Sequence, residues 1–236
     1  MSEIFVSSKN AFPIIPLTKD RLSSWCKKQR KEIQSWVATI GFDASPGKTC
    51  LISCLDGNLE KVLVGVSNNT NIWDCGNLAQ ELPKGTYRFQ HSNKKDVEKW
   101  ALGWALGSYH FDRYKGTKSR KKAQISLPKN SSLEAIIQGI FLTRDLINTP
   151  AEDMGPSDLA NAARQIAKKY NAKINIIVGE NLLKKNYPAI YAVGRAVKTV
   201  RQSPRLIDFK WGKGNNPKLT LVGKGVCFDT GGLDIK

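Results

Sequence analysis

Short continuous apolar segments alternate with helical patterns in the second half of the chain, and this alternation most constrains its fold. Apolar residues at helical spacing after Ser131, and again after Pro156, predict two amphipathic helices. The strand-like segments that follow are KINIIV (173–178), PRLIDFKW (204–211) and KLTLV (218–222). Strands that are apolar throughout must be covered on both faces, so the pattern predicts a parallel or mixed sheet between helices.

The first 128 residues predict a smaller α/β unit. The segments TCLISCL (49–55) and KVLVGVS (61–67) flank a polar stretch and predict a β-hairpin, and TYRFQHS (86–92) predicts a further strand. Five apolar residues recur at helical spacing between 96 and 108 and predict a helix with a core-facing stripe. They are Val97, Trp100, Ala101, Trp104 and Ala105.

The boundary between two domains is expected near Pro128. Ser131 and Glu134 have the spacing of a capping box and predict the start of a new helix. Its inner face is expected to contain Leu133, Ile136, Ile137 and Ile140. Pro156 predicts the first turn of the next helix. We therefore expect an N-terminal α/β domain over residues 1–128 and a second domain over residues 129–236.

The net charge of +17 raises the question of an acidic partner. The densest basic run comprises Lys115, Lys118, Arg120, Lys121 and Lys122. No aromatic residues are interleaved with it, as a stacking platform for nucleic acid would require. A solvated connector is therefore the preferred interpretation. A nucleic-acid-binding module in the basic N-terminal half remains the alternative.

The absence of targeting signals points to the cytoplasm. No signal peptide is evident at the N-terminus, and no apolar run is long enough for a membrane span, so we expect no membrane association. The five cysteines contain no C-x-x-C pair, which argues against zinc-ribbon and redox motifs. Buried free thiols in a reduced compartment are the expected outcome.

The chemically richest segment follows the predicted strand at 219–222. Glycines there permit tight turns, and four charged residues stand in an otherwise apolar stretch: Lys224, Asp229, Asp234 and Lys236. A phosphate loop lacks its G-x-x-x-x-G-K-[ST] spacing. An aspartic protease would need a second carboxylate and an all-β fold. The third interpretation is a metal site with Asp229 as a carboxylate ligand and Lys224 as a neutral amine ligand.

The segment VGKGVCFDTGGLDIK (222–236) resembles the signature of the leucyl (cytosol) aminopeptidase family. The resemblance extends upstream through TRDLINTPAEDMGPSDLA (143–160), YAVGRA (191–196) and SPRLIDFKWG (203–212), with a weaker stretch at 104–115. It covers about residues 100–236. It implies a small, variable N-terminal α/β domain followed by the start of a mixed-sheet α/β metallopeptidase domain.

The resemblance also implies a site and an activity. Lys224 matches the lysine ligand of one metal, Asp229 the carboxylate that bridges two divalent ions (Mn or Zn), and Lys236 the catalytic lysine. The remaining ligands and the catalytic arginine would lie further along than this sequence goes. The family implies release of N-terminal, preferably apolar, residues from peptides by a homo-hexamer, and we expect the 236-residue chain alone to be inactive. His91 and His110 are far from the motif, so we expect packing or surface roles for them.

Overall fold

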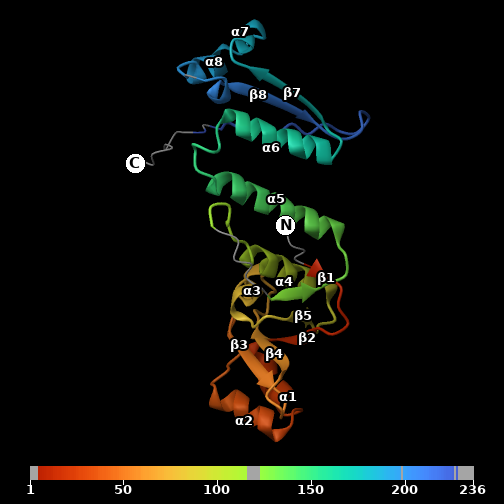
Figure 1. Ribbon diagram of the computed structural model, residues 1–236. Helices are drawn as coiled ribbons and strands as arrows, with labels where there is room; N and C mark the ends of the chain where they lie inside the picture. The colour runs from red at the N-terminus through yellow and green to blue at the C-terminus, as the bar shows by residue number, and fades with distance from the viewer. Residues whose placement is uncertain (1–4, 116–122, 198, 226, 228–236) are drawn as a thin grey trace. The chain divides into compact units, whose positions relative to one another are not determined.

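The computed structural model describes residues 5–115, 123–197, 199–225 and 227 (Figure 1). Most of the dense basic run, together with Asp229 and Lys236, lies outside these residues. The chain forms two compact units, Met1–Thr143 and Arg144–Lys236. No helix among the described residues is both long and apolar enough to cross a membrane.

The first unit is built on a six-stranded sheet with the order β1-β6-β5-β2-β4-β3. Its strands are β1 (Phe5–Val6), β2 (Phe12–Leu17), β3 (Thr49–Ser53), β4 (Leu59–Gly65), β5 (Thr86–Phe89) and β6 (Gln124–Ser126). Every neighbouring pair is parallel except β3–β4, which forms the antiparallel hairpin expected from the polar stretch between these strands. The α/β class is confirmed, and the sheet of this first unit is mixed and mostly parallel.

Strand β2 lies inside the sheet although it contains Pro13 and Pro16, which have no N–H to donate. The carbonyl of Ile14 accepts a hydrogen bond from the backbone N–H of Gln90, just beyond β5. The backbone N–H and C=O groups of successive β2 residues therefore point alternately toward β5 and toward β4. Pro13 then faces β4, whose pairing begins one residue later, and Pro16 faces β5, whose pairing ends at Ile14. Both prolines therefore fall where a neighbouring strand requires no donor.

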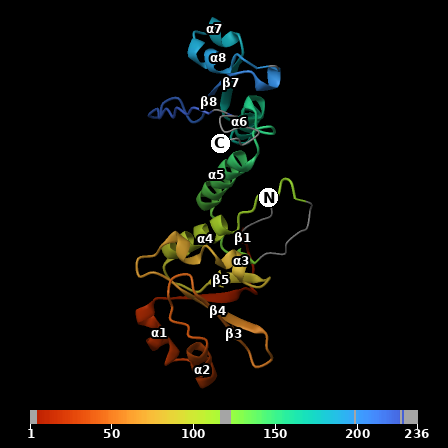
Figure 2. The same cartoon turned by 90° about the vertical axis from the view of Figure 1, so that its left-hand side faces the viewer.

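Helices cover both faces of this sheet (Figure 2). They are α1 (Lys19–Cys26), α2 (Lys31–Thr39), α3 (Leu78–Glu81), α4 (Lys94–Gly107) and α5 (Ser131–Asn148), with the short 3-10 helix η1 (Ile72–Cys75). Ile33 and Val37 of α2 pack with Leu63 on one face. Residues of α3, α4 and α5 up to Phe141 share a larger cluster with Ile14, Val62 and Val64 on the other.

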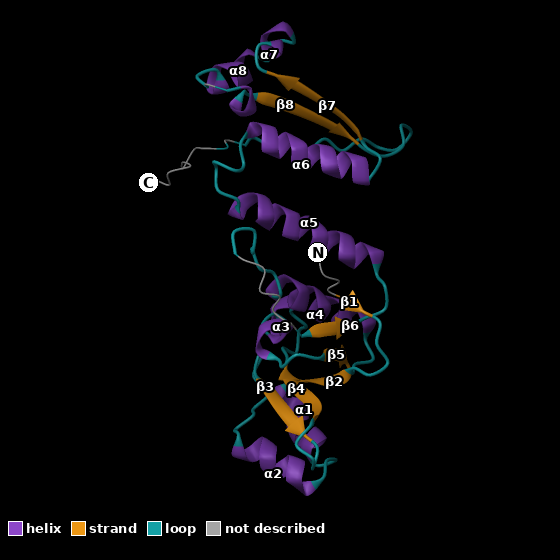
Figure 3. Ribbon diagram, viewed as in Figure 1, coloured by secondary structure: helices purple, strands orange, loops and turns teal. Residues whose placement is uncertain are grey.

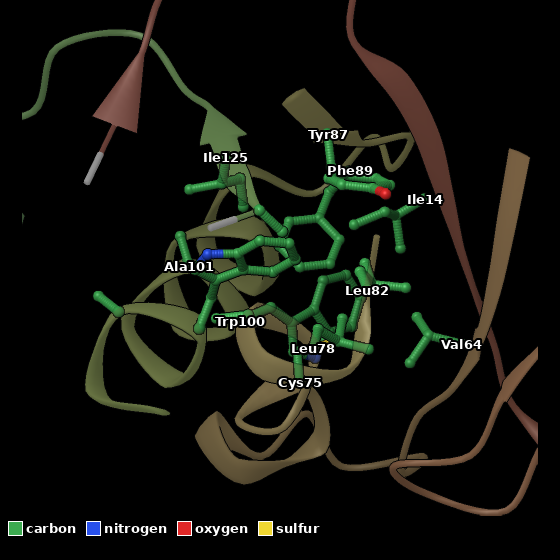
Figure 4. Close-up of a cluster of buried hydrophobic side chains, with 14 of the residues drawn as sticks. Ile14, Val64, Cys75, Leu78, Leu82, Tyr87, Phe89, Trp100, Ala101 and Ile125 are labelled. Atoms are coloured by element: carbon green, nitrogen blue, oxygen red, sulfur yellow. The ribbon is translucent and has the colours of Figure 1, made fainter. Parts of the chain in front are cut away.

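The larger core is centred on aromatic side chains from α4 and β5 (Figure 4). The rings of Phe89 and Trp100 lie 5.6 Å apart, and those of Tyr87 and Trp104 lie 6.0 Å apart, each pair tilted by about 45°. Trp100, Ala101, Trp104 and Ala105 are fully buried, and Val97 packs against them. The core stripe predicted for this helix is confirmed.

The start of α5 differs from the predicted capping box at Ser131 and Glu134. Ser131 is already helical, and the Oδ1 atom of Asn130 accepts from the backbone N–H of Leu133 at 3.1 Å. Asn130 is therefore the N-cap residue, and its backbone carbonyl accepts the first helical hydrogen bond, from the N–H of Glu134. The expectation that Ile136 faces inward was wrong, because 52% of its surface is exposed, while Leu133 and Ile137 are buried as expected.

The second unit contains a two-stranded antiparallel sheet of β7 (Lys173–Val178) and β8 (Arg205–Lys210). Figure 3 shows α6 (Pro156–Lys169) on one side of these strands, and α7 (Asn181–Lys184) and α8 (Pro188–Gly194) on the other. The 3-10 helix η2 (Val200–Gln202) precedes β8. The helix predicted from Pro156 and the strands predicted at 173–178 and 204–211 are confirmed.

The strand predicted at 218–222 is absent. Residues 217–225 have no regular secondary structure, and Leu219, Leu221 and Val222 are 85–93% exposed. A β-strand is stable only when its backbone N–H and C=O groups pair with a neighbouring strand. Among the described residues of this unit, β7 and β8 pair only with each other, and 218–222 pairs with neither.

Candidate metal centre

Lys224 is the one predicted site residue that the structure describes. It lies in the irregular segment after Pro217, and it is exposed. Asp229 and Lys236 fall outside the described residues, so the structure does not test whether the three side chains come together. The predicted metal site therefore remains a prediction.

The segment after Lys224 contacts the first turn of α6. A Cβ atom on Gly225 would lie 3.9 Å from the Cδ2 atom of Leu159. Cys227 is half-buried. Burial raises the pKa of the Cys227 thiol, and the charge of Asp158 raises it further.

Asp158 accepts two hydrogen bonds at the start of α6. Its Oδ2 atom accepts from the backbone N–H of Gly155, which closes the start of α6, and from Nε of Arg201, both at 3.1 Å. The carboxylate also lies near the helix N-terminus, where the helix dipole favours negative charge. The guanidinium of Arg201 donates a second bond, from Nη2 to the carbonyl of Glu152, at 3.1 Å. One arginine of η2 therefore joins the first turn of α6 to the loop before it.

Arg205, the first residue of β8, adds positive charge to the same region. Burial lowers the pKa of its guanidinium, the charge of Arg164 lowers it further, and the charge of Asp158 acts in the opposite direction. Its Nη2 atom donates to the carbonyl of Val200 at 2.8 Å. Its Nε atom is buried and has no hydrogen-bond partner in the described part of the chain. Arg201 therefore remains the arginine that bonds to Asp158 in the described part of this unit.

The predicted ligands Lys224 and Asp229 carry atoms that can bind a divalent ion. An amine nitrogen from Lys224 and a carboxylate oxygen from Asp229 are both ligand types that zinc and manganese accept. Two donors are too few for two ions, however. Across residues 5–115, 123–197, 199–225 and 227, no three His, Cys, Asp or Glu side chains gather in a way that could hold a metal.

His91 takes a packing role, as expected. The Nε2 atom of His91 lies 3.3 Å from the Asp96 carboxylate, and its ring lies edge-on against Trp100 with centroids 5.0 Å apart. The first unit therefore offers no histidine-based centre among its described residues.

Two stretches of the chain match known protein families, and the second includes the segment around Lys224. Residues 12–128 match the family described as M17 aminopeptidase, N-terminal domain, and residues 141–236 match the one described as Cytosol aminopeptidase family, catalytic domain. The chain belongs to the cytosol aminopeptidase family. Both halves match peptidase domains, and no finding supports the alternative of a nucleic-acid-binding module.

Individual members of the cytosol aminopeptidase family agree with this assignment. The chain is 32% identical over 176 residues to "Probable cytosol aminopeptidase 1" of Shewanella oneidensis, an alignment that covers 68% of this chain and 34% of the relative. It is 43% identical to the crystal structure of the cytosol aminopeptidase from Coxiella burnetii, with a TM-score of 0.88 over 98% of this chain and 51% of that one.

A more distant structure, a bottromycin maturation enzyme in complex with Mn, shares the fold. It has 17% identity and a TM-score of 0.67, and the match covers 86% of this chain and 45% of that one. The chain therefore spans about a third of the curated relative and about half of the solved structures it matches.

Sequence reasoning missed Asp158 and Arg201. A signal for Asp158 was present, because it stands three residues after Gly155 and two after Pro156, where an acidic side chain caps a helix. No comparable signal exists for Arg201, which lies 43 residues from Asp158 along the chain.

Proposed function

We propose that the complete protein is an aminopeptidase that releases N-terminal residues from peptides. The observation that carries this proposal is the match of residues 141–236 to the catalytic domain of the cytosol aminopeptidase family, since that range includes Lys224, Asp229 and Lys236. The proposal concerns the whole protein, because the chain spans only part of its relatives.

Divalent metal use is part of the proposal. Two ions, manganese or zinc, would supply Lewis acidity and an activated water for attack on a peptide carbonyl. Lys224 would bind one ion through its neutral amine, and Asp229 would bridge both through its carboxylate. Lys236, kept protonated, would lie beside the scissile carbonyl and stabilise negative charge on its oxygen. The bottromycin enzyme that shares the fold was solved with Mn, which supports manganese as the first ion to test.

The finer properties follow the family. We expect a preference for apolar N-terminal residues, assembly into a homo-hexamer, and a location in the cytosol, where the names of the relatives place them. The 236-residue chain alone should be inactive, because two protein ligands leave most coordination positions to water and metal affinity falls accordingly.

The decisive experiment compares the complete protein with the 236-residue chain, using leucine amide as substrate. The complete protein should hydrolyse it, lose activity after chelation, and regain activity with added Mn²⁺ or Zn²⁺. The shorter chain should show no turnover. A complete protein that stays inactive with every divalent ion tested would refute the proposal, and turnover by the shorter chain would refute the predicted inactivity.

A further inference from the structure

Strand β3 forms one end of the six-stranded sheet, and among the described residues one of its sides pairs with no other strand. The strand at the other end, β1, has only two residues, whereas β3 has five. An open edge presents a row of unpaired N–H and C=O groups on which another strand can pair. Residues 49–55, TCLISCL, include no charged residue, proline or glycine that would oppose such pairing.

The hydrogen bonds of β3 show which of its residues face the open side. The carbonyl of Lys48 accepts from the backbone N–H of Gly65 at 2.9 Å, so the backbone groups of Lys48 face β4. Backbone groups alternate in direction along an antiparallel strand, so those of every second residue after Lys48 face β4 as well. The backbone groups of Thr49, Leu51 and Ser53 therefore point to the open side.

Trp36 of α2 stands in the middle of this open side. Its indole Nε1 atom donates to the backbone carbonyl of Leu51 at 3.0 Å. Helix α2 is held beside β3 because Ile33 and Val37 share a buried cluster with Cys50. Trp36 itself remains 49% exposed, so it covers the edge without joining the core. A donor to an outward carbonyl occupies the place that the next strand of the sheet would take.

We propose that Trp36 guards this edge against pairing with β3 of a second copy of the chain. The edge is complementary to itself: in antiparallel pairing centred on Leu51, the outward groups of Leu51 meet those of the same residue in the other copy, and Thr49 meets Ser53. The carbonyl at the centre of that pairing is the one that Trp36 occupies. The indole of each copy must therefore leave before the two strands can pair. This role is independent of the proposed peptidase activity.

Sedimentation velocity of the 236-residue chain over a range of concentrations measures the association. Trp36→Ala should strengthen dimer formation about tenfold to a hundredfold, because one hydrogen bond in each copy no longer has to break. Trp36→Phe keeps a ring but has no donor, so its association should lie between those of wild type and Trp36→Ala. Trp73→Ala is the matched control, because it removes another exposed tryptophan of the same unit, and it should change nothing.

Charges at position 51 test the register of the pairing. The Leu51 side chain is 38% exposed, so a charged side chain there can reach water. In the Trp36→Ala background, Leu51→Lys and Leu51→Glu should each abolish the dimer, because like charges then stand directly opposite each other. An equimolar mixture of the two double variants should restore the dimer, since opposite charges then pair.

The mixture separates strand pairing from association through exposed apolar surface. Association that persists in each double variant alone would come from such surface and would overturn the proposal. So would a Trp36→Ala chain that associates no more strongly than the wild type, or a wild-type dimer that Leu51→Lys dissolves. Far-UV circular dichroism checks that each variant is folded, and if Trp36→Ala unfolds, Trp36→Phe replaces it in the same comparisons. Peptidase activity enters none of these measurements.

Discussion

A Cβ atom at Gly103 would lie 1.6 Å from the carbonyl oxygen of Ile72. Helix α4 and η1 therefore pack backbone against backbone, and Gly107 repeats the arrangement one turn later against the carbonyl of Gly76, also at 1.6 Å. Glycine at these positions is a requirement of close approach.

Gly103→Ala should destabilise the first unit severely. The neighbouring atom is backbone and cannot rotate away, so we expect a loss above the ~1–3 kcal/mol of ordinary overpacking. Gly139→Ala is the matched control, because Gly139 is an exposed helical glycine and a Cβ atom added there would meet no atom within 4 Å. It should gain about 0.8–1 kcal/mol from helix propensity. The free energy of unfolding of both variants is measured by urea denaturation. Similar changes in the two variants would contradict the close packing of α4 against η1.

Asn130→Ala should weaken the start of α5, whereas Ser131→Ala should not. Asn130 accepts from the Leu133 N–H, and loss of such a cap costs about 1 kcal/mol. Asn130 also donates to the Glu98 carboxylate at 2.9 Å, so Asn130→Ser, which keeps a cap acceptor without reaching Glu98, separates the two contributions. The midpoints of thermal unfolding rank the three variants by stability. A larger loss in Ser131→Ala would restore the capping box expected from the sequence.

Stability should fall at alkaline pH because buried thiols resist ionisation. Burial raises the pKa of Cys50 to about 11, with Cys26 adding to the shift, and burial raises the pKa of Cys75 well above its usual value of 9.0. A raised pKa in the folded state contributes stability below the unfolded pKa, and that stability is lost as pH rises through the folded pKa. The window for Cys50 is therefore pH 9 to about 11.

Cys50→Ala tests this window. Its deficit in the free energy of unfolding should be largest at about pH 8 and shrink towards about pH 11, because the variant has no thiol to ionise. Val62→Ala, which also shortens a fully buried side chain, should show the same deficit at every pH. Urea midpoints at several pH values provide the measurement. Parallel pH profiles for the two variants would exclude Cys50 as a source of alkaline sensitivity.

In the complete protein, Asp229→Ala and Lys224→Ala should differ in metal content. In the proposed site the Asp229 carboxylate would bind both ions and Lys224 only one, so Asp229→Ala should lose both ions and Lys224→Ala should mainly weaken the binding of one. Activity should fall in both variants. Metal analysis after dialysis, with activity re-measured in added Mn²⁺ or Zn²⁺, checks this. Two tightly bound ions and a normal rate in Asp229→Ala would show that the motif is not the metal site.

Local patterns predicted those elements whose partners are close in sequence. The stripe from Val97 to Ala105 anticipated the buried face of α4, and the polar stretch between β3 and β4 anticipated their hairpin. No pattern predicted β2, because two prolines argue against an interior strand until the ends of its neighbours are known.

The sequence by itself indicated the family, through the resemblance of residues 222–236 to the aminopeptidase signature. It also determined most of the alternation of strands and helices, because that depends on the spacing of apolar residues. Tertiary structure alone decided that Asn130 caps α5, that residues 218–222 pair with no described strand, and that Arg201 reaches Asp158. Each of these depends on which hydrogen-bonding groups meet in space. Partners 43 residues apart, such as Asp158 and Arg201, leave no periodic trace in the chain.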